Sequence, residues 1–267
     1  MKRSKVLWWV FVSCCISVGA SQAASKSDRA KEKRWESQIV DSLLVGEDVK
    51  LDADGVEFLG LYAENHTGTS KGGVIIIHGI GVHPAWPDVI EPLRMNLPDR
   101  GWHTLSIQMP ILENEAEGKD YIPLFDEVPG RITAAVEFLQ EREVAPIVVV
   151  AHSLGASMAG YYLAQKDQPA IKAAVLIGFG NMLQDEKSPL NSLNIIRNIK
   201  VPVLDLYGAN DLKPVLEYAP KRKQAMQTMS NKVYQQQKVE GANHFFQGKE
   251  MELVKTVDSW LTQQAPK

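Results

Sequence analysis

Cysteine is almost missing from this chain of 267 residues: the only two, Cys14 and Cys15, are adjacent and stand near the amino terminus. A fold stapled by several disulfides and a zinc site built on a cysteine cluster are therefore excluded. The six histidines are scattered, without HExxH spacing. The phosphate-loop pattern GxxxxGK followed by Ser or Thr and the dinucleotide pattern GxGxxG are absent as well. We therefore expect neither a metal ion nor an organic cofactor.

Excess positive charge is also lacking. The formal net charge is -3, so no overall basic field points to a nucleic-acid partner. Hydrophobic residues make up 45% of the chain, charged residues 23% and aromatic residues 7%, which is typical of a globular protein. The sequence shows no internal repeat, low-complexity block or long Pro/Gly/Ser linker. Its length suits one α/β domain with a continuous core.

The first 23 residues have the pattern of a secretory signal peptide. A basic start with Lys2, Arg3 and Lys5 precedes a mostly apolar run over 6–20, and Ser21 and Ala23 place small residues before the predicted cleavage site. The apolar run is shorter than the roughly 20 residues that span a bilayer. An uncleaved anchor and a lipid-modified Cys14 are the alternatives.

Cleavage after Ala23 would change both charge and redox chemistry. It removes three of the 29 basic residues and none of the 32 acidic ones, so the net charge of the mature chain becomes -6. Both cysteines leave with the signal, so we expect no disulfide in an oxidising compartment. We also expect no stable membrane insertion after cleavage. The sequence leaves the oligomeric state open.

The remaining chain divides into two parts. Residues 24–50 form a charged N-terminal arm or helix, in which 25–36 are interpreted as a solvated arm or first helix turn. Ile39, Leu43 and Leu44 give this helix an apolar stripe. Residues 51–267 form the main domain.

Strand and helix patterns alternate through the main domain. A parallel sheet covered by helices on both faces is the fold class that such alternation predicts, and ligands bind at the carboxyl ends of its strands. The strand over 56–62 alternates apolar and polar residues, as a half-exposed strand would, whereas 73–77 is a continuous apolar run. The other predicted strands are 104–108, 147–150, 173–177, 203–207 and 232–239, and the predicted helices are 87–97, 127–142, 154–165, 215–229 and 249–261.

One strand ends on an unusual serine. Ala151, Ser153 and Gly155 have the small-x-Ser-x-Gly spacing of a nucleophile elbow, in which a serine sits on a tight turn between strand and helix. The turn needs small residues two positions before and after the serine. Gly155 meets this need fully, and Ala151 replaces the more usual glycine. The alternative is a serine that only caps the following helix.

An acid and a histidine follow later strands in the order that the elbow requires. Asp211 comes just after the strand over 203–207, and His244 follows the strand over 232–239. Asp205 is the competing acid, but its mid-strand position directs it to the core or a helix. His152, beside the serine, is interpreted as a packing residue or as a residue that supports a member of the site, and His78 and His83 are the other histidines near the site.

Acyl transfer also needs donors for a developing oxyanion. The backbone N–H of Leu154, directly after the serine, is one candidate. The second is the N–H of Ile80 in the turn His78-Gly79-Ile80-Gly81, which follows the strand over 73–77. The alternative for this turn is a simple glycine-rich strand exit.

The motifs HGIG, AHSLG, GAND and GANH, in this order, resemble the α/β-hydrolase superfamily across nearly the whole mature chain. More narrowly, residues 72–110 resemble a proteobacterial α/β-hydrolase-like family of unknown function whose members usually carry secretion signals. The resemblance implies an α/β-hydrolase fold, a periplasmic location and Ser153, Asp211 and His244 as the triad. Ala151 departs from the usual elbow glycine.

The sequence therefore predicts a serine hydrolase that cleaves an ester or related acyl bond of a small molecule through an acyl-enzyme. A non-catalytic binding or envelope-assembly protein with the same fold is the alternative, although such a protein has no reason to keep all three residues. A small cap or none is expected. An acidic insertion over 111–121 is either a solvated loop or an element that selects cationic groups, and a small apolar flap is expected from Met182, Leu183, Leu190, Leu193 and Ile196.

Overall fold

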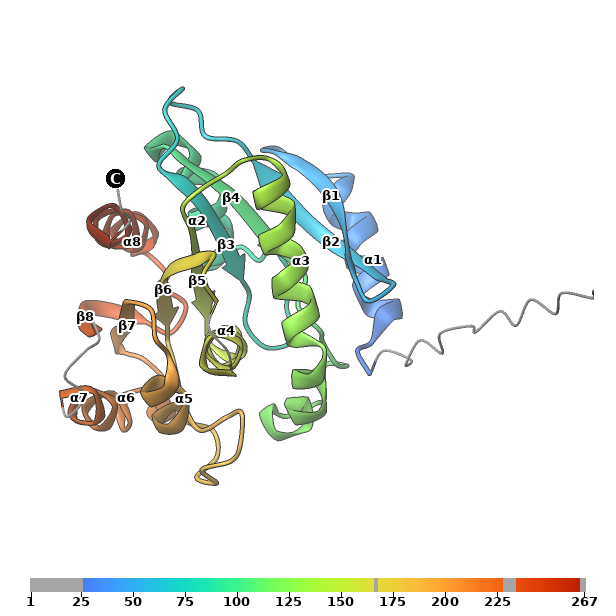
Figure 1. Cartoon of the computed structure of the whole chain (residues 1–267). Coiled ribbons are helices and arrows are strands. Elements are labelled where there is room, and N and C mark those ends of the chain that lie inside the picture. The colour runs from blue at the N-terminus through green and yellow to red at the C-terminus, as the bar shows by residue number, and fades with distance from the viewer. Residues whose placement is uncertain (1–25, 166–167, 228–233, 265–267) are drawn as a thin grey trace, which may run out of the picture.

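The computed structural model describes residues 26–165, 168–227 and 234–264 (Figure 1). The predicted signal peptide and its cleavage site lie outside the described residues and stay a prediction. Within the described ranges, no helix is both long and apolar enough to cross a membrane.

A single eight-stranded sheet forms the centre of the molecule, with strand order β1-β2-β4-β3-β5-β6-β7-β8. β1 and β2 are antiparallel to each other, and β2 is antiparallel to β4, whereas all later pairs are parallel. The predicted fold class is thus confirmed. The strands are β1 (Glu47–Ala53), β2 (Val56–Ala63), β3 (Gly72–Ile77), β4 (Trp102–Ile107), β5 (Ile147–His152), β6 (Ile171–Ile177), β7 (Val203–Asn210) and β8 (Tyr234–Asn243).

Helices cover both faces of this sheet (Figure 1). Alternate side chains of the central strands enter two separate core clusters: Ile75 and Ile77 of β3 pack with α3, α4 and α5, while Val74 and Ile76 pack with α2 and α8. A strand buried on both faces needs an apolar residue at every position, which explains the unbroken run in β3. The helices are α1 (Arg29–Val40), α2 (Ile90–Asn96), α3 (Val128–Glu141), α4 (Leu154–Gln165), α5 (Ser192–Asn198), α6 (Lys213–Leu216), α7 (Ala219–Gln227) and α8 (Glu250–Gln264), with short 3₁₀ segments η1 (Pro98–Arg100) and η2 (Gly118–Asp126).

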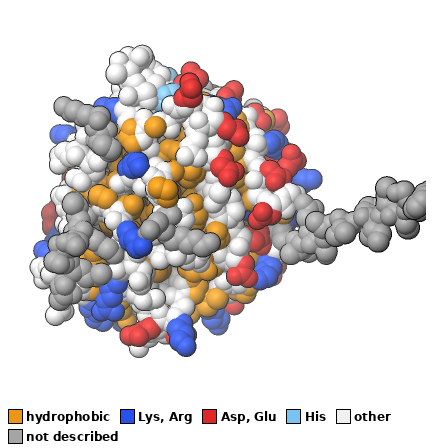
Figure 2. Space-filling model, viewed as in Figure 1, with side chains coloured by type: hydrophobic (Ala, Val, Ile, Leu, Met, Phe, Trp, Pro, Cys, Tyr) orange, Lys and Arg blue, Asp and Glu red, His pale blue; other side chains and the backbone are white. Residues whose placement is uncertain are grey.

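The amino-terminal part is more integrated than its charge pattern predicts. α1 packs Ile39 against Leu59 and Leu61 of β2, and its charged residues Lys31 and Glu32 are buried. β2 is therefore covered on both sides from Phe58 onward, so the prediction of a half-exposed strand is wrong. Figure 2 shows acidic side chains gathered on the right-hand side of the molecule, where Figure 1 places α1 and β1.

Two other predicted elements differ from the structure. The helix expected over 215–229 is divided into α6 and α7, with Pro220 at the beginning of α7. The expected apolar flap is also wrong, because Leu190 and Ile196 are fully buried in the main core and belong to the segment that leads into α5. Only Met182 of that set is exposed, at 40%.

Candidate active site

Ser153 is the single residue that connects β5 to α4. Its φ angle is 57°, in the left-handed region that serine adopts rarely and at a cost in strain. Its backbone N–H donates to the Ile177 carbonyl of the neighbouring strand at 2.8 Å. A methyl group at Gly155 would lie 2.2 Å from the His78 carbonyl oxygen, so no side chain fits there. The corner therefore has the backbone geometry of a nucleophile elbow.

The three residues of the predicted triad form one hydrogen-bonded chain. His244 Nε2 lies 2.9 Å from Ser153 Oγ, and His244 Nδ1 lies 2.5 Å from Asp211 Oδ1. A carboxylate only accepts, so Nδ1 carries the proton and Nε2 is left to accept from the serine hydroxyl. This order of contacts is the one that activates a serine nucleophile.

Asp211 is fixed by the turn after β7. Its Oδ1 accepts from the Leu212 N–H at 2.7 Å, and its Oδ2 accepts from the Gly208 N–H at 3.2 Å. The side chain is buried, as is most of His244. These backbone donors hold the carboxylate toward His244.

Sequence reasoning missed the contribution of Gly178, which directly follows β6. Its φ angle is 58°, and a methyl group there would lie 2.8 Å from His244 Cε1. Both the backbone angle and the close approach require glycine, so Gly178 lets the loop after β6 pass beside the imidazole. A glycine directly after a predicted strand, between the elbow and the acid, was the available signal.

His152 holds the backbone of His244 through a hydrogen bond. Its Nε2 donates to the His244 carbonyl oxygen at 2.9 Å, and the two rings lie 4.8 Å apart. Burial lowers the pKa of His152 to about 3, which keeps the ring neutral. The packing role predicted for His152 thus includes a specific hydrogen bond.

The glycine-rich turn after β3 lies against the nucleophile. A methyl group at Gly79 would be 3.2 Å from Ser153 Cβ. His78 Nε2 accepts from the Met109 N–H at 2.9 Å, so its Nδ1 carries the proton and donates to the Gly79 carbonyl at 2.9 Å. Leu154 begins α4 directly after the serine. Leu154 and Ile80 are the two residues predicted to supply oxyanion donors. Leu154 directly follows Ser153, and Ile80 directly follows Gly79, which lies against Ser153.

The competing acid Asp205 has a different partner. It is fully buried in β7 and forms a two-pronged ion pair with Arg222 of α7, with nitrogen–oxygen distances of 2.8 and 3.1 Å. The Tyr234 hydroxyl at the start of β8 donates to the same carboxylate at 2.6 Å. Asp205 is thus engaged away from His244.

Neutral buried histidines make stability depend on pH. Burial lowers the pKa of both His78 and His152 to about 3, from an ordinary value of 6.5. Between these values the unfolded chain binds a proton at each ring and the folded chain does not, so the free energy of unfolding falls as pH falls. Each histidine is expected to lower the free energy of unfolding by about 2 kcal/mol when the pH falls from 7 to 5. Burial also lowers the pKa of His83, to about 4, so this ring contributes in the same direction. Urea unfolding at both pH values measures the sum, and His152→Gln should reduce the difference by about 2 kcal/mol. Equal stability of the wild-type protein at pH 7 and pH 5 would contradict the assignment.

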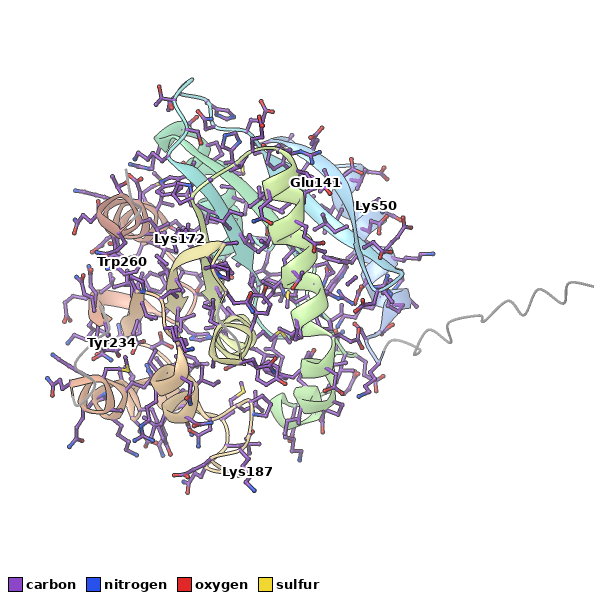
Figure 3. All side chains as sticks on the ribbon, in the orientation of Figure 1. Lys50, Glu141, Lys172, Lys187, Tyr234 and Trp260 are labelled. Atoms are coloured by element: carbon purple, nitrogen blue, oxygen red, sulfur yellow. The ribbon has the colours of Figure 1, made fainter. Side chains whose placement is uncertain are left out.

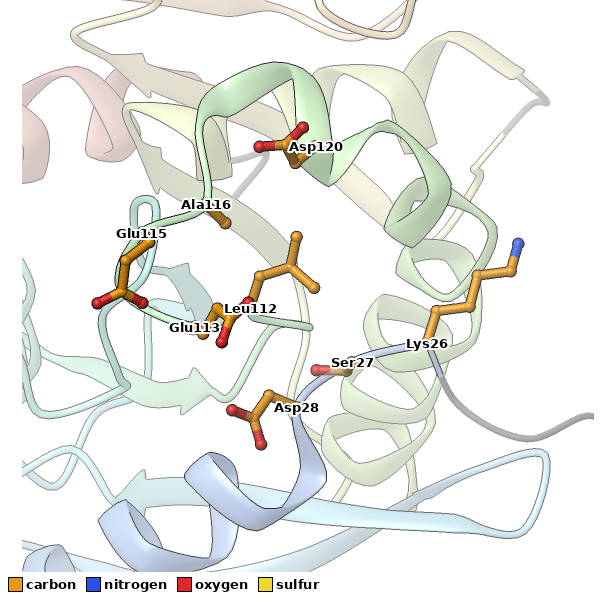
Figure 4. A pocket seen from close by; sticks show the side chains of 8 residues that line it. All are labelled: Lys26, Ser27, Asp28, Leu112, Glu113, Glu115, Ala116 and Asp120. Carbon is orange, nitrogen blue, oxygen red and sulfur yellow. The ribbon is translucent and has the colours of Figure 1, made fainter.

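The acidic insertion lies beside the N-terminal segment. Its carboxylates Glu113, Glu115 and Asp120 are exposed, and together with Lys26 and Asp28 they border a hollow of about 460 Å³ (Figure 4). In the described ranges, no group of three or more His, Cys, Asp or Glu side chains is arranged to hold a metal ion. The exposure of the carboxylates agrees with a solvated loop.

Exposed apolar side chains are concentrated on the segments that follow three neighbouring strands. Six large hydrophobic residues are exposed in the described part of the chain, and four of them lie on the loops and short helix that follow β6, β7 and β8. The tip of the first loop is marked by Lys187 in Figure 3. The ring of Phe245 lies 5.2 Å from that of His244, and Gly180 packs against Pro214 and Val215. We call these four residues the apolar rim: Met182, Leu212, Leu216 and Phe245.

Comparison with solved structures places this architecture among α/β-hydrolase folds. Est1E from Butyrivibrio proteoclasticus is similar with a TM-score of 0.64 and 17% identity, covering 81% of this chain and 98% of that one. A dienelactone hydrolase from Anabaena variabilis gives 0.63 and 19%, covering 82% and 97%. A cold-adapted esterase from an Arctic intertidal metagenomic library gives 0.61 and 21%, covering 82% and 93%. These identities show the fold and leave the reaction to the site.

Comparison by sequence assigns the family. No curated protein gives a significant match. The family model described as "Protein of unknown function (DUF3530)" matches residues 11–121 and 124–263, which is nearly the whole chain. The protein therefore belongs to this family and adopts an α/β-hydrolase fold.

Proposed function

We propose that the protein is a serine hydrolase that cleaves a carboxylic ester through an acyl-enzyme. The observation that carries this proposal is the hydrogen-bonded chain from Ser153 through His244 to Asp211, with the serine in a strained backbone conformation at a strand end. Strain at a solvent-reachable corner is retained where function requires it. Ser153 is half-buried, so a small substrate can reach its hydroxyl.

In the first half of the reaction, His244 Nε2 takes the hydroxyl proton as Ser153 Oγ bonds to the substrate carbonyl carbon. Asp211 holds the imidazole in the tautomer that accepts this proton and stabilises the imidazolium. The negative charge on the carbonyl oxygen is received by the N–H groups of Leu154 and Ile80. When the bond to the alcohol breaks, His244 returns its proton to the departing oxygen.

In the second half, a water molecule replaces the alcohol. His244 Nε2 removes one proton from the water as its oxygen attacks the acyl carbon. The bond to Ser153 Oγ then breaks, and the serine recovers the proton from His244. The carboxylic acid leaves, and the enzyme returns to its starting state without a cofactor.

The surroundings of the site support an uncharged, modestly apolar acyl group. The apolar rim lies on the segments that follow β6, β7 and β8, two of which also carry Asp211 and His244, and Met182 contacts Gly118 of the insertion after β4. The described loops add short elements rather than a separate cap domain. Esters of short or medium chain length suit such a site, because a small apolar mouth gains from burying a few methylene groups.

A panel of p-nitrophenyl esters tests this function. We expect turnover of the acetate, butyrate and hexanoate esters by the purified chain beginning near Ala24, and inhibition of that turnover by a fluorophosphonate. The alternative, a binding protein that keeps the fold, predicts no turnover and no labelling. Labelling without turnover of any ester would leave the nucleophile correct and the proposed ester class wrong.

A further inference from the structure

A buried network of polar groups connects the N-terminal helix to the turn beside the nucleophile. Arg131 of α3 is almost completely buried, at 1% exposure, and its Nη2 donates to Glu32 of α1 at 2.9 Å. Glu127 adds a second carboxylate 3.7 Å from the same nitrogen. Glu32 also accepts from the Ser27 hydroxyl and from Arg29. A buried guanidinium needs such partners, because an uncompensated charge in the interior is costly.

The network continues through a single peptide plane. Arg131 Nη1 donates to the Gln108 carbonyl oxygen at 2.9 Å, just after β4. The N–H on the other side of the same peptide belongs to Met109, and it donates to His78 Nε2 at 2.9 Å. Because a peptide unit is planar, fixing its carbonyl also fixes the direction of its N–H. Arg131 therefore sets the orientation of one of the two donors to His78 Nε2; the other is the Gln108 side-chain amide, at 3.0 Å.

His78 passes the same constraint to a second peptide. Its Nδ1–H donates to the Gly79 carbonyl, and the N–H of that peptide belongs to Ile80, the proposed oxyanion donor. The next residue, Gly81, packs against the Tyr121 hydroxyl, which accepts from the Leu112 N–H. The turn is thus held on both sides of Ile80.

The N-terminal segment forms hydrogen bonds with the segment that follows β4 and with the residue before α3. Ser27 Oγ accepts from the Ile111 N–H at 2.8 Å, and the Asp28 N–H donates to the Ile111 carbonyl at 2.8 Å. The Lys26 N–H donates to Glu127 at 2.6 Å. Figure 4 shows Ser27 and Asp28 facing the chain that carries Leu112. These contacts hold Glu32 beside Arg131, and they tie both to the segment that follows β4.

We infer that the N-terminal segment from Ser27 to Glu32 helps to hold the proposed oxyanion donor, the Ile80 N–H, in place. Within this segment, Glu32 is a positioning residue. Glu32 acts through Arg131, the Gln108–Met109 peptide and His78 on the Ile80 N–H. This inference rests on the proposed function, because the Ile80 N–H matters only if an oxyanion forms. It assigns a role in turnover to residues interpreted from sequence as a solvated arm.

Glu32→Gln tests the inference, with Glu36→Gln as the matched control. Glu36 lies one turn later on α1 and pairs with Lys50 on the surface. We expect Glu32→Gln to lower kcat for a p-nitrophenyl ester at least about tenfold, less than the 10²–10³ lost on removal of an oxyanion donor. Its KM should stay within about threefold of wild type, because ground-state binding of the ester does not use the oxyanion donors. Glu36→Gln should keep wild-type kcat.

A spectroscopic readout separates positioning from a loss of stability. In nitrogen-15 spectra of the imidazole groups, Glu32→Gln should shift the His78 signals and leave those of His152 unchanged. Wild-type kcat in folded Glu32→Gln would overturn the inference, as would a loss of kcat with unmoved His78 signals. If this variant does not fold, Ser27→Ala, which removes one partner of Glu32, is measured by the same two readouts.

Failure of the proposed function gives a different pattern. In that case the wild-type protein neither hydrolyses any ester nor reacts with a fluorophosphonate. The His78 spectrum still reports on the network then, because it needs no substrate. Unmoved His78 signals in Glu32→Gln would overturn the network, and shifted signals would support it.

Discussion

Replacement of Ser153 by alanine is expected to lower kcat for any ester substrate by roughly 10⁵–10⁶-fold. The variant loses the atom that attacks the acyl carbon, so His244 and the oxyanion donors act only on bound water. The fold should be kept, because alanine is smaller than serine and the core does not require the Ser153 hydroxyl. Initial rates with a p-nitrophenyl ester, beside circular dichroism of both proteins, measure the two effects separately.

Retention of more than about one-hundredth of wild-type kcat in Ser153→Ala would argue against this nucleophile, because residual catalysis without it is far smaller. Ser157 of α4 provides a matched control. It is buried one turn further along the same helix, and Ser157→Ala should leave kcat within about twofold. A loss at Ser157 and none at Ser153 would move the nucleophile along the helix.

Asp211→Asn is expected to lower kcat by about 10⁴-fold. The carboxylate holds the proton on His244 Nδ1, and an amide of the same shape can present its NH₂ group instead. The imidazole then places its proton on Nε2, facing Ser153, where it cannot accept the hydroxyl proton. The unfolding temperature should change far less than kcat, because the variant keeps the volume of the side chain.

Asp205→Asn is the contrasting variant. It removes one charge of a buried ion pair and leaves the Arg222 guanidinium uncompensated, which typically costs about 3–5 kcal/mol. We therefore expect a lower unfolding temperature, with kcat close to wild type at temperatures where the variant is folded. A large loss of kcat at Asp205 together with normal activity at Asp211 would reverse the assignment of the acid.

The fold and the meeting of Ser153, His244 and Asp211 at one edge of the sheet could be predicted because both depend on local patterns. Apolar runs such as that of β3 identify central strands, since every position of such a strand is buried. The triad residues stand directly after strand ends, where parallel strands bring distant residues to one edge. The spacing around Ser153 is dictated by a steric limit within five residues, and Gly155 shows that limit in the structure.

Features that depend on tertiary contacts could not be predicted in the same way. Glu32 and Lys31 lie in a strongly charged run, and only their partners Arg131, Leu112 and Asn114 explain why they are buried. β1 was missed, because its sequence alternates charged and apolar residues and pairs at an edge. Leu190 and Ile196 were expected in a flap, although their complete burial makes them part of the main core.

The central claim is that Ser153 is a nucleophile activated by His244 and Asp211. Reaction of the purified protein with a fluorophosphonate, followed by mass spectrometry of its peptides, tests this most directly. The prediction is a single adduct on the Ser153 hydroxyl, formed at a rate that falls sharply in both His244→Ala and Asp211→Asn. No adduct, or an adduct at another residue that forms equally fast in these variants, would contradict the claim.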